Sequence, residues 1–210
     1  MANEETAGGR RERHARGGGR GTARGKLLAA ASTRFYAQGV AATGIDVITA
    51  DAGVAKMSLY NNFRSKADLV ASYLEQRQQE FREVHGRRLA ALPAGAGPGA
   101  RALTVFDAYL EHAERTDGFR GCGLLNVAGE LPTGDPNRSA VARHKAEVQQ
   151  LLRDALGPQD DDPAPVGGVD DLAEHLSLLL EGAVVRAGLE SDPEHLRRAR
   201  RLAAGLVGES

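Results

Sequence analysis

The hydrophobic positions near the start of the chain follow the spacing of a helix. Leu28, Ala31 and Phe35 fall at i, i+3 and i+7, which places them on one helical face. Gly39 follows at the point where a helix would need a left-handed residue at its end. We therefore expect a first helix from Thr22 to just before Gly39.

A short second helix and a tight turn are expected next. Thr43 has Asp46 three residues later, which is similar to a capping box, and Ile45 with Ile48 supplies an apolar side. Gly53 then makes the turn. A third short helix, over about residues 55–61, would complete a small core by packing back on the first helix through Val54, Leu59, Tyr60 and Phe63.

A longer fourth helix follows, capped by Ser65 with Asp68. Its apolar residues continue at helical spacing towards residue 92; they are Leu69, Tyr73, Leu74 and Phe81. The sequence PAGAGPG at 93–99 then interrupts the pattern. Proline and glycine both oppose helix continuation, so the fourth helix should end there.

The second half of the chain is helical by the same criteria. Helical spacing is kept by Leu103, Phe106, Tyr109, Leu110 and Ala113. Asp135 before Pro136, and Asp192 before Pro193, are typical helix starts with an N-cap and a proline in the first turn. No segment alternates as a strand would, and the predicted fold class is all-α.

The segment 170–190 carries apolar residues on two faces. One stripe consists of Leu172, Leu176, Leu179, Ala183 and Ala187, and the other of Leu178, Gly182, Val185 and Leu189. A surface helix of a monomer normally has one apolar stripe, so the second face should pack on a second subunit. A final helix to residue 207 would turn inward Leu196, Ala199, Ala203 and Leu206, and outward Arg197, Arg198 and Arg201. The last two helices, about 170–207, are therefore the predicted homodimer interface.

Composition excludes several classes of protein. The 210 residues, 41% of them hydrophobic, suffice for one domain or two small ones. Cys122 is the only cysteine, which rules out an intramolecular disulfide and a Cys-rich metal cluster and fits a reducing, cytoplasmic location. The first 24 residues lack the apolar segment of a signal peptide, and no run of eighteen apolar residues indicates a membrane span.

Charge is distributed unevenly along the chain although the net charge is only −1. Residues 1–70 hold eleven Lys/Arg against six Asp/Glu, while residues 71–210 hold sixteen against twenty-two. This asymmetry favours a polyanionic partner for the N-terminal part, with a solvated charged surface as the alternative. Residues 1–21 are rich in glycine and arginine, and we expect a mobile basic arm.

Residues 43–63, TGIDVITADAGVAKMSLYNNF, join two short helices through the turn at Gly53, which is the sequence form of a helix-turn-helix. With its flanking helices, this stretch resembles the TetR family of bacterial transcriptional regulators. The resemblance covers about 45 residues and rests on Phe35, Gly39, Thr43, Ile48, Ala52, Gly53, Val54, Leu59, Tyr60, Phe63 and Lys66. It implies a homodimer that inserts the helix over 55–61 into the major groove of double-stranded DNA.

The expected DNA contacts lie on that helix and beside it. Its exposed side chains would be Lys56, Ser58, Tyr60 and Asn61, donors that can reach base edges or phosphates, and Met57 could touch a thymine methyl group. Lys66 would meet a phosphate together with the N-terminal amides of the fourth helix, and Thr43 would contact the DNA backbone or cap its own helix. As an alternative to contacting DNA, Tyr60 and Phe63 could pack in the core, and Asn62 could only end the helix.

Residues 120–130, RGCGLLNVAGE, and the segment after them resemble a C-terminal domain found in one branch of this family, which dimerises and encloses a small-molecule effector. Candidate cavity residues are Phe106, Tyr109, Leu110, Cys122, Leu125, Asn126, His144, Glu147, Leu151, His175 and Leu179, each of which could equally be core. Cys122 could be a redox switch or an inert buried thiol. His144 and Glu147 lie one helical turn apart, but no third ligand has metal-binding spacing, so no metal or cofactor is expected.

The predicted organisation is a basic arm (1–21), a three-helix DNA-binding domain (22–65) and an all-helical ligand-binding and dimerisation domain (66–210). We expect a repressor that binds a palindromic operator and is released by an unknown small-molecule effector. An activator, or a regulator controlled through a protein partner, would have the same sequence features. An all-α enzyme is disfavoured because G-x-S-x-G, GK[ST] and HExxH motifs and a convincing carboxylate pair are missing.

Overall fold

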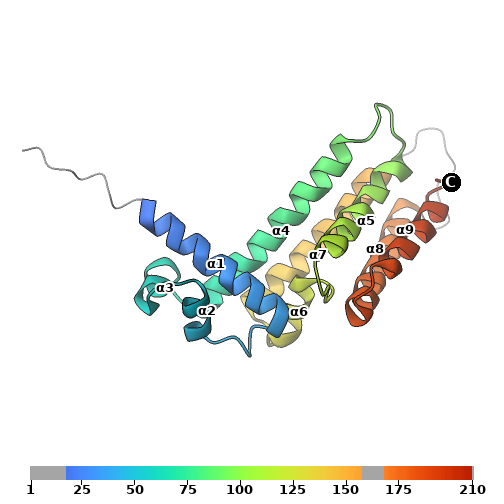
Figure 1. Cartoon of the computed structure of the whole chain (residues 1–210). Coiled ribbons are helices and arrows are strands. Elements are labelled where there is room, and N and C mark those ends of the chain that lie inside the picture. The colour runs from blue at the N-terminus through green and yellow to red at the C-terminus, as the bar shows by residue number, and fades with distance from the viewer. Residues whose placement is uncertain (1–17, 158–167, 210) are drawn as a thin grey trace, which may run out of the picture.

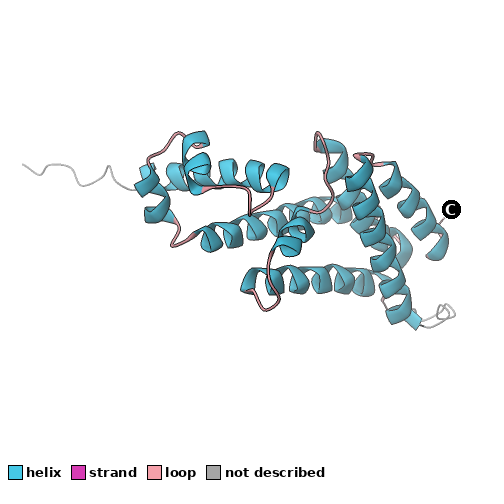
Figure 2. Ribbon diagram, turned by 90° about the horizontal axis from the view of Figure 1, so that it is seen from below, coloured by secondary structure: helices cyan, strands magenta, loops and turns pink. Residues whose placement is uncertain are grey.

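The computed structural model describes residues 18–157 and 168–209, and this part of the chain is helical with no strand (Figures 1 and 2). The helices are α1 (Gly18–Gln38), α2 (Ile45–Asp51), α3 (Lys56–Asn62), α4 (Lys66–Ala90), α5 (Pro98–Arg115), α6 (Gly123–Glu130), α7 (Pro136–Leu156), α8 (Gly168–Glu190) and α9 (Glu194–Leu206). The all-α prediction is confirmed. Helix α1 begins at Gly18, so the last four residues of the expected arm are helical, since an established helix extends at little cost. Residues 1–17 of that arm lie outside the described residues.

Two hydrophobic cores divide the molecule. The first joins α1–α3 to the start of α4, and its α1 face is Leu27, Ala31 and Phe35 rather than the predicted set with Leu28, which is only partly buried. Because Leu69 and Leu74 of α4 close this core, it extends beyond residue 65, where we expected the DNA-binding domain to end. The second core joins α5, α7, α8 and α9.

The ends of the first helices depend on two glycines and one serine. Gly39 (φ +88°) has the left-handed conformation that the sequence predicts for it, and Gly53 (φ +62°), predicted to make the turn, is left-handed as well. Ser65 Oγ accepts the backbone N–H of Asp68 at 3.1 Å, which confirms the cap of α4. The predicted Thr43 cap is wrong: Gly44 precedes α2, and the Thr43 hydroxyl instead donates to the Gly39 carbonyl at 2.7 Å, satisfying the end of α1.

Of the two Asp-Pro helix starts in the second half, the one at Asp135 is confirmed, because Asp135 is the N-cap of α7 and accepts the N–H of Asn137 at 2.7 Å. The predicted Asp192 cap is wrong, because Pro193 is the N-cap of α9. Asp192 lies one residue earlier and accepts the N–H of Glu194 at 2.9 Å. Helix α9 buries Leu196, Ala199 and Ala203 as predicted. The prediction for Leu206 is wrong, because it lies one turn after Leu202 on the outer side of the helix and is 54% exposed.

An unpartnered apolar surface covers the outer side of α8 and α9, which lie side by side at the end of the molecule away from α1–α3 (Figure 1). The second stripe of α8 is exposed in the single chain, with Leu178 at 63% and Leu189 at 80%. We call this surface the α8–α9 face; it consists of Leu178, Leu179, Gly182, Val185, Leu189, Leu202 and Leu206.

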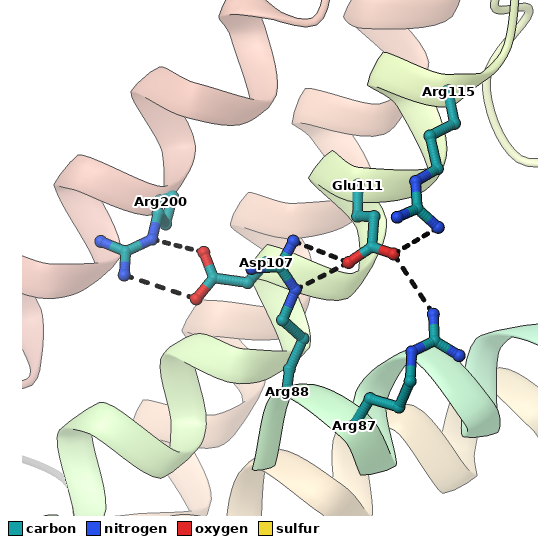
Figure 3. A network of polar contacts seen from close by, with 6 residues as sticks. All are labelled: Arg87, Arg88, Asp107, Glu111, Arg115 and Arg200. Carbon is teal, nitrogen blue, oxygen red and sulfur yellow. Dashed lines mark hydrogen bonds and ion pairs between the residues drawn. The ribbon is translucent and has the colours of Figure 1, made fainter. Parts of the chain in front are cut away.

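Helix α4 connects the two cores and is fixed to the second by a buried carboxylate (Figure 3). Glu111 of α5 pairs with Arg87 (3.2 Å) and Arg88 (2.6 Å) of α4 and with Arg115 of its own helix (2.7 Å). Burial opposes ionisation of Glu111, but the hydrogen bond from Arg88 and the charges of Arg115 and Arg88 outweigh it and lower its pKa. One helical turn before Glu111, Asp107 of α5 pairs with Arg200 of α9 at 2.6 Å, so α5 is joined by ion pairs to both α4 and α9. None of the helices described has the length and apolar character needed to cross a membrane.

Candidate nucleic-acid interface and ligand cavity

Helix α3 presents a polar face to solvent because its other face is anchored in the first core. Leu59 and Phe63 are buried, which leaves Lys56, Met57, Tyr60 and Asn61 exposed. Met57 is 68% and Tyr60 49% exposed, so the alternative of Tyr60 as a core residue is wrong, whereas it is right for Phe63. The turn at Gly53 places α2 and α3 as two packed helices, the geometry of a helix-turn-helix.

Two of the polar side chains on the α2–α3 helix-turn-helix already have hydrogen-bond partners. Lys56 Nζ lies 2.8 Å from Asp46 of α2, and the hydrogen bond to that carboxylate raises the pKa of Lys56. This ion pair directs the Lys56 ammonium from α3 towards α2, and a DNA phosphate would compete with Asp46 for the ammonium. Asn62 donates to the carbonyl of Ser58 at 2.7 Å and thus closes the helix, while the Ser58 side chain is partly buried.

Thr43 and Lys66 are less available than the sequence suggested. Thr43 is 1% exposed with its hydroxyl engaged, so its side chain cannot contact DNA in this conformation. Lys66 Nζ donates to the carbonyl of Val40 at 2.6 Å, which joins α4 to the α1–α2 turn and leaves the ammonium two further donors. Sequence reasoning passed over Arg64, whose side chain is 92% exposed between α3 and the N-terminus of α4. Its basic charge beside a helix start was the available signal.

A cavity of about 190 Å³ lies between α4, α5, α6, α7 and α8. Its lining consists of Arg77, Glu80, Phe81, Val84, Ala108, Tyr109, Glu111, His112, Arg115, Phe119, Gly121, Cys122, Gly123, Leu124, His144 and Val184. Of the predicted ligand residues, only Tyr109, Cys122 and His144 line it.

The other predicted ligand residues lie elsewhere for identifiable reasons. Phe106 is packed in the second core, and Leu110, Leu125 and Leu151 pack at the edges of the cores. Asn126 donates to the carbonyl of Arg120 on the surface, and Glu147 is paired with Arg82 at 2.9 Å. His175 and Leu179 line a shallow depression on the α8–α9 face with Leu202, Gly205 and Leu206.

The polar groups of the cavity are close to electrically neutral. Arg77 pairs with Glu80 at 2.5 Å, yet no hydrogen bond in the described structure satisfies its buried Nε. Burial lowers the pKa of His112, helped by the charge of Arg77, and burial together with the charge of Lys145 lowers the pKa of His144 to about 4. Both imidazoles are therefore neutral near pH 7. The aromatic wall includes Phe81, whose ring meets His144 edge-on at 5.6 Å.

Tyr109 is fixed from behind by a second polar pair. Lys145 Nζ donates to the Tyr109 hydroxyl at 3.1 Å and pairs with Glu181 of α8 at 2.8 Å. Burial opposes the charge of Lys145, but its neighbours Cys122, Tyr109 and Glu181 outweigh that effect and raise its pKa. Burial raises the pKa of Tyr109, which stays a neutral donor.

Metal binding has no support from the placement of the titratable groups. His144 Nδ1 lies 3.8 Å from Glu147, but the Glu147 carboxylate is already paired with Arg82 at 2.9 Å. Across residues 18–157 and 168–209, no three His, Cys, Asp or Glu side chains converge in a way that could hold a metal.

Comparison with known proteins is consistent with this geometry. Residues 27–73 match the family described as bacterial regulatory proteins, tetR family, and residues 98–203 match the tetracyclin repressor-like C-terminal domain. The chain is 32% identical over 182 residues to the transcriptional regulator AcuR of Cereibacter sphaeroides, covering 81% of this chain and 78% of that protein.

Solved structures agree over nearly the whole length. A TetR-family transcriptional regulator from Streptomyces coelicolor shares 29% identity at a TM-score of 0.76, covering 90% of this chain and 95% of that one. A regulatory protein TetR from Rhodobacter sphaeroides shares 26% identity at a TM-score of 0.72, covering 88% and 98%.

Proposed function

The chain belongs to the TetR family of bacterial DNA-binding transcriptional regulators, a non-enzymatic family, and we propose that it is a homodimeric repressor released from a palindromic operator by a small-molecule effector. One arrangement carries this proposal: a solvent-facing, donor-rich α3 at one end of the chain and an unpartnered apolar face on α8 and α9 at the other. The first suits a nucleic acid, and the second suits another subunit.

DNA contact would be made by the exposed side of α3. Asn61 and Lys56 can donate to base edges, Met57 can contact a thymine methyl group, and Tyr60 offers a hydroxyl at the same surface. Lys66 and Arg64 lie at the start of α4, where phosphate would meet both a positive side chain and backbone amides. Ser58 would contribute only at the edge of this surface, because it is partly buried.

Dimerisation would bury the α8–α9 face against its own copy. In a twofold arrangement each residue of the face is used twice, and the four helices would form a bundle with the two α3 helices projecting from the opposite end. Two recognition helices about one turn of DNA apart (~34 Å) would then match a palindromic site.

The effector would occupy the cavity between α4 and α8. An engineered cavity of about 150 Å³ holds benzene, so 190 Å³ suits one molecule of similar or slightly larger size. The walls are mostly apolar, and Arg77 is neutralised by Glu80. Two buried polar atoms of lining residues have no hydrogen-bond partner in the described structure, Arg77 Nε and His144 Nδ1. We therefore propose a small, largely apolar effector with a hydrogen-bond acceptor that meets the N–H of Arg77.

Release from DNA would follow from a preference of the effector for one arrangement of the helices. Four cavity residues lie on α4, the helix that also closes the DNA-binding core. A ligand can shift the equilibrium only as far as its affinities for the two arrangements differ.

Electrophoretic mobility shifts with genomic fragments test DNA binding, and a thermal-shift screen with small carbonyl compounds tests the cavity. A salt-sensitive specific complex that dissociates on addition of a stabilising compound is the expected result. The absence of any specific DNA complex at low salt would refute the proposed function.

A further inference from the structure

The two lysines beside the proposed DNA surface have different kinds of partner. Lys66 Nζ donates to a neutral group, the backbone carbonyl of Val40, at 2.6 Å, so this side chain keeps its full positive charge. Lys56 Nζ lies 2.8 Å from the Asp46 carboxylate, and this pair has no net charge. An acid at a surface that binds a polyanion calls for an explanation, because the phosphates repel it.

The Asp46–Lys56 pair has a fixed geometry because the turn between its two helices is closed. Helices α2 and α3 lie side by side and are joined through Gly53 (Figure 1). The backbone N–H of Gly53 donates to the carbonyl of Ala50, and that of Val54 donates to the carbonyl of Thr49, each at 3.1 Å. The backbone positions from which the two charged side chains extend are therefore set relative to each other.

Both members of the pair remain accessible to a DNA molecule. The side chain of Asp46 is 79% exposed and that of Lys56 is 55% exposed. An exposed ion pair of this kind contributes little to the stability of a fold, because water and salt screen it. The effect of the pair should therefore be sought at the DNA surface.

The pair would lie at the edge of α3 that enters the major groove. Lys56 is the first residue of α3, and a recognition helix contacts base edges through its N-terminal residues while the preceding helix crosses the DNA backbone. Asp46 of that preceding helix would then lie near the phosphates. Water is displaced from such an interface, so charges interact more strongly there than in bulk solvent. An unpaired carboxylate would be unfavourable in this position, and the pair should persist on DNA.

A paired lysine can still donate to a base. An ammonium group has three N–H donors, and the contact with Asp46 leaves two of them for other acceptors. Guanine presents two acceptors, O6 and N7, in the major groove and is the usual base partner of lysine. A phosphate, by contrast, would attract Lys56 but repel Asp46. The neutral pair therefore favours a base edge over a phosphate.

We infer that Asp46 is a specificity-determining residue, which positions Lys56 for a base edge and balances its charge against attraction to phosphates. The base expected opposite Lys56 is guanine. The inference rests on the proposed placement of α3 in the major groove. Within that placement Lys66 contributes attraction to any sequence, and the Asp46–Lys56 pair contributes discrimination between sequences.

The test uses Asp46→Asn, which removes the charge and keeps the size of the side chain. Fluorescence anisotropy measures binding of the full-length protein to a pool of random-sequence duplexes over a range of salt concentrations. Affinity for the pool at low salt should rise about three- to tenfold per contacting subunit, because the released Lys56 neutralises a phosphate. For the same reason, the slope of log affinity against log salt concentration should steepen by about one per subunit. Adding Lys56→Ala to Asp46→Asn should remove the added slope.

Asp51→Asn is the matched control, because it removes the same charge from the other end of α2, where Arg34 of α1 is the partner. This control should leave the slope unchanged. Circular dichroism melts verify that each variant is folded, and Asp46→Ser is the second variant at the site. Sequencing of the bound duplexes should show that enrichment of the wild type's preferred sequences falls in both Asp46 variants.

Unchanged slope and enrichment in both Asp46 variants, or an equal gain in Asp51→Asn, would overturn the inference. Asn61→Ala tests the placement of α3 separately. If Asn61→Ala alters the sequence preference and the Asp46 variants do not, the inference about Asp46 fails alone. If none of these variants changes DNA binding, the placement of α3 in the groove fails with it.

Discussion

Replacing Leu178 by aspartate should dissociate the proposed dimer. Leu178 is 63% exposed in the single chain and belongs to the α8–α9 face. Fully burying a leucine side chain stabilises by about 1.5–3 kcal/mol, so the exposed share at this site amounts to about 1–2 kcal/mol per copy.

A twofold interface contains each residue twice, and the loss is therefore about 2–4 kcal/mol per dimer. At about 1.4 kcal/mol per tenfold change, the dimer dissociation constant should rise about 30-fold to 1,000-fold. Two buried carboxylates add a desolvation cost, which makes this range a lower bound.

Sedimentation equilibrium of wild type and variant over a range of concentrations measures this constant directly. Leu89→Asp is the matched control, because Leu89 is an exposed leucine near the end of α4 and outside the α8–α9 face. A Leu178→Asp protein as dimeric as the control, or a wild-type protein that is monomeric at micromolar concentration, would refute the reasoning.

Three further predictions address stability, pH and DNA contact. Gly188→Ala should lower the free energy of unfolding by about 1–3 kcal/mol or more, because a Cβ there would overlap the backbone of Gly121. Gly86→Ala on α4, where the space around the glycine is open, should instead raise the free energy of unfolding by about 0.5–1 kcal/mol. Chemical denaturation measures both values, and equal effects of the two substitutions would contradict the packing at Gly188. His144 has a pKa of about 4 in the folded chain against an ordinary value of 6.5, so unfolding takes up a proton and the stability of the protein falls as pH drops through that interval. The stability of the His144→Gln variant should fall less steeply over the same interval. Parallel stability profiles for the variant and the wild type would exclude a buried neutral imidazole. In DNA-binding assays across salt concentrations, Lys66→Ala should weaken binding to all DNA sequences and flatten the dependence of log affinity on log salt concentration by about one, whereas Asn61→Ala should change the base preference. An equal loss of affinity for every DNA sequence in Asn61→Ala would leave Asn61 with a positioning role only.

Periodicity and local chemistry predicted the helices well but erred where a contact with a distant segment decides a residue's role. The fold class, the Gly53 turn and the Ser65 cap follow from residues within one or two turns of each other. Thr43 has the right spacing for a cap, yet its hydroxyl serves the end of the preceding helix. Leu206 continues an apolar period, but at the last turn of α9 it lies on the outer side with Leu202.

The cavity could be predicted only in small part, because its walls come from helices that are far apart in the sequence. Arg77, Glu80 and Val84 have the pattern of an ordinary amphipathic helix, and only the packing of α4 on α5, α6 and α7 turns them inward. Conversely, His175 and Leu179 were expected beside a ligand but lie on the α8–α9 face. The hydrogen bond from the backbone N–H of Val40 to Glu130 of α6 likewise spans 90 residues in the sequence and has no local signal.

The most direct test of the central claim is selection of genomic fragments by the purified protein at low salt, followed by footprinting of the best fragment. A homodimer with two projecting α3 helices predicts a protected palindrome with half-sites about one helical turn (~34 Å) apart. Failure to enrich any fragment, or protection of a single site without twofold symmetry, would contradict it.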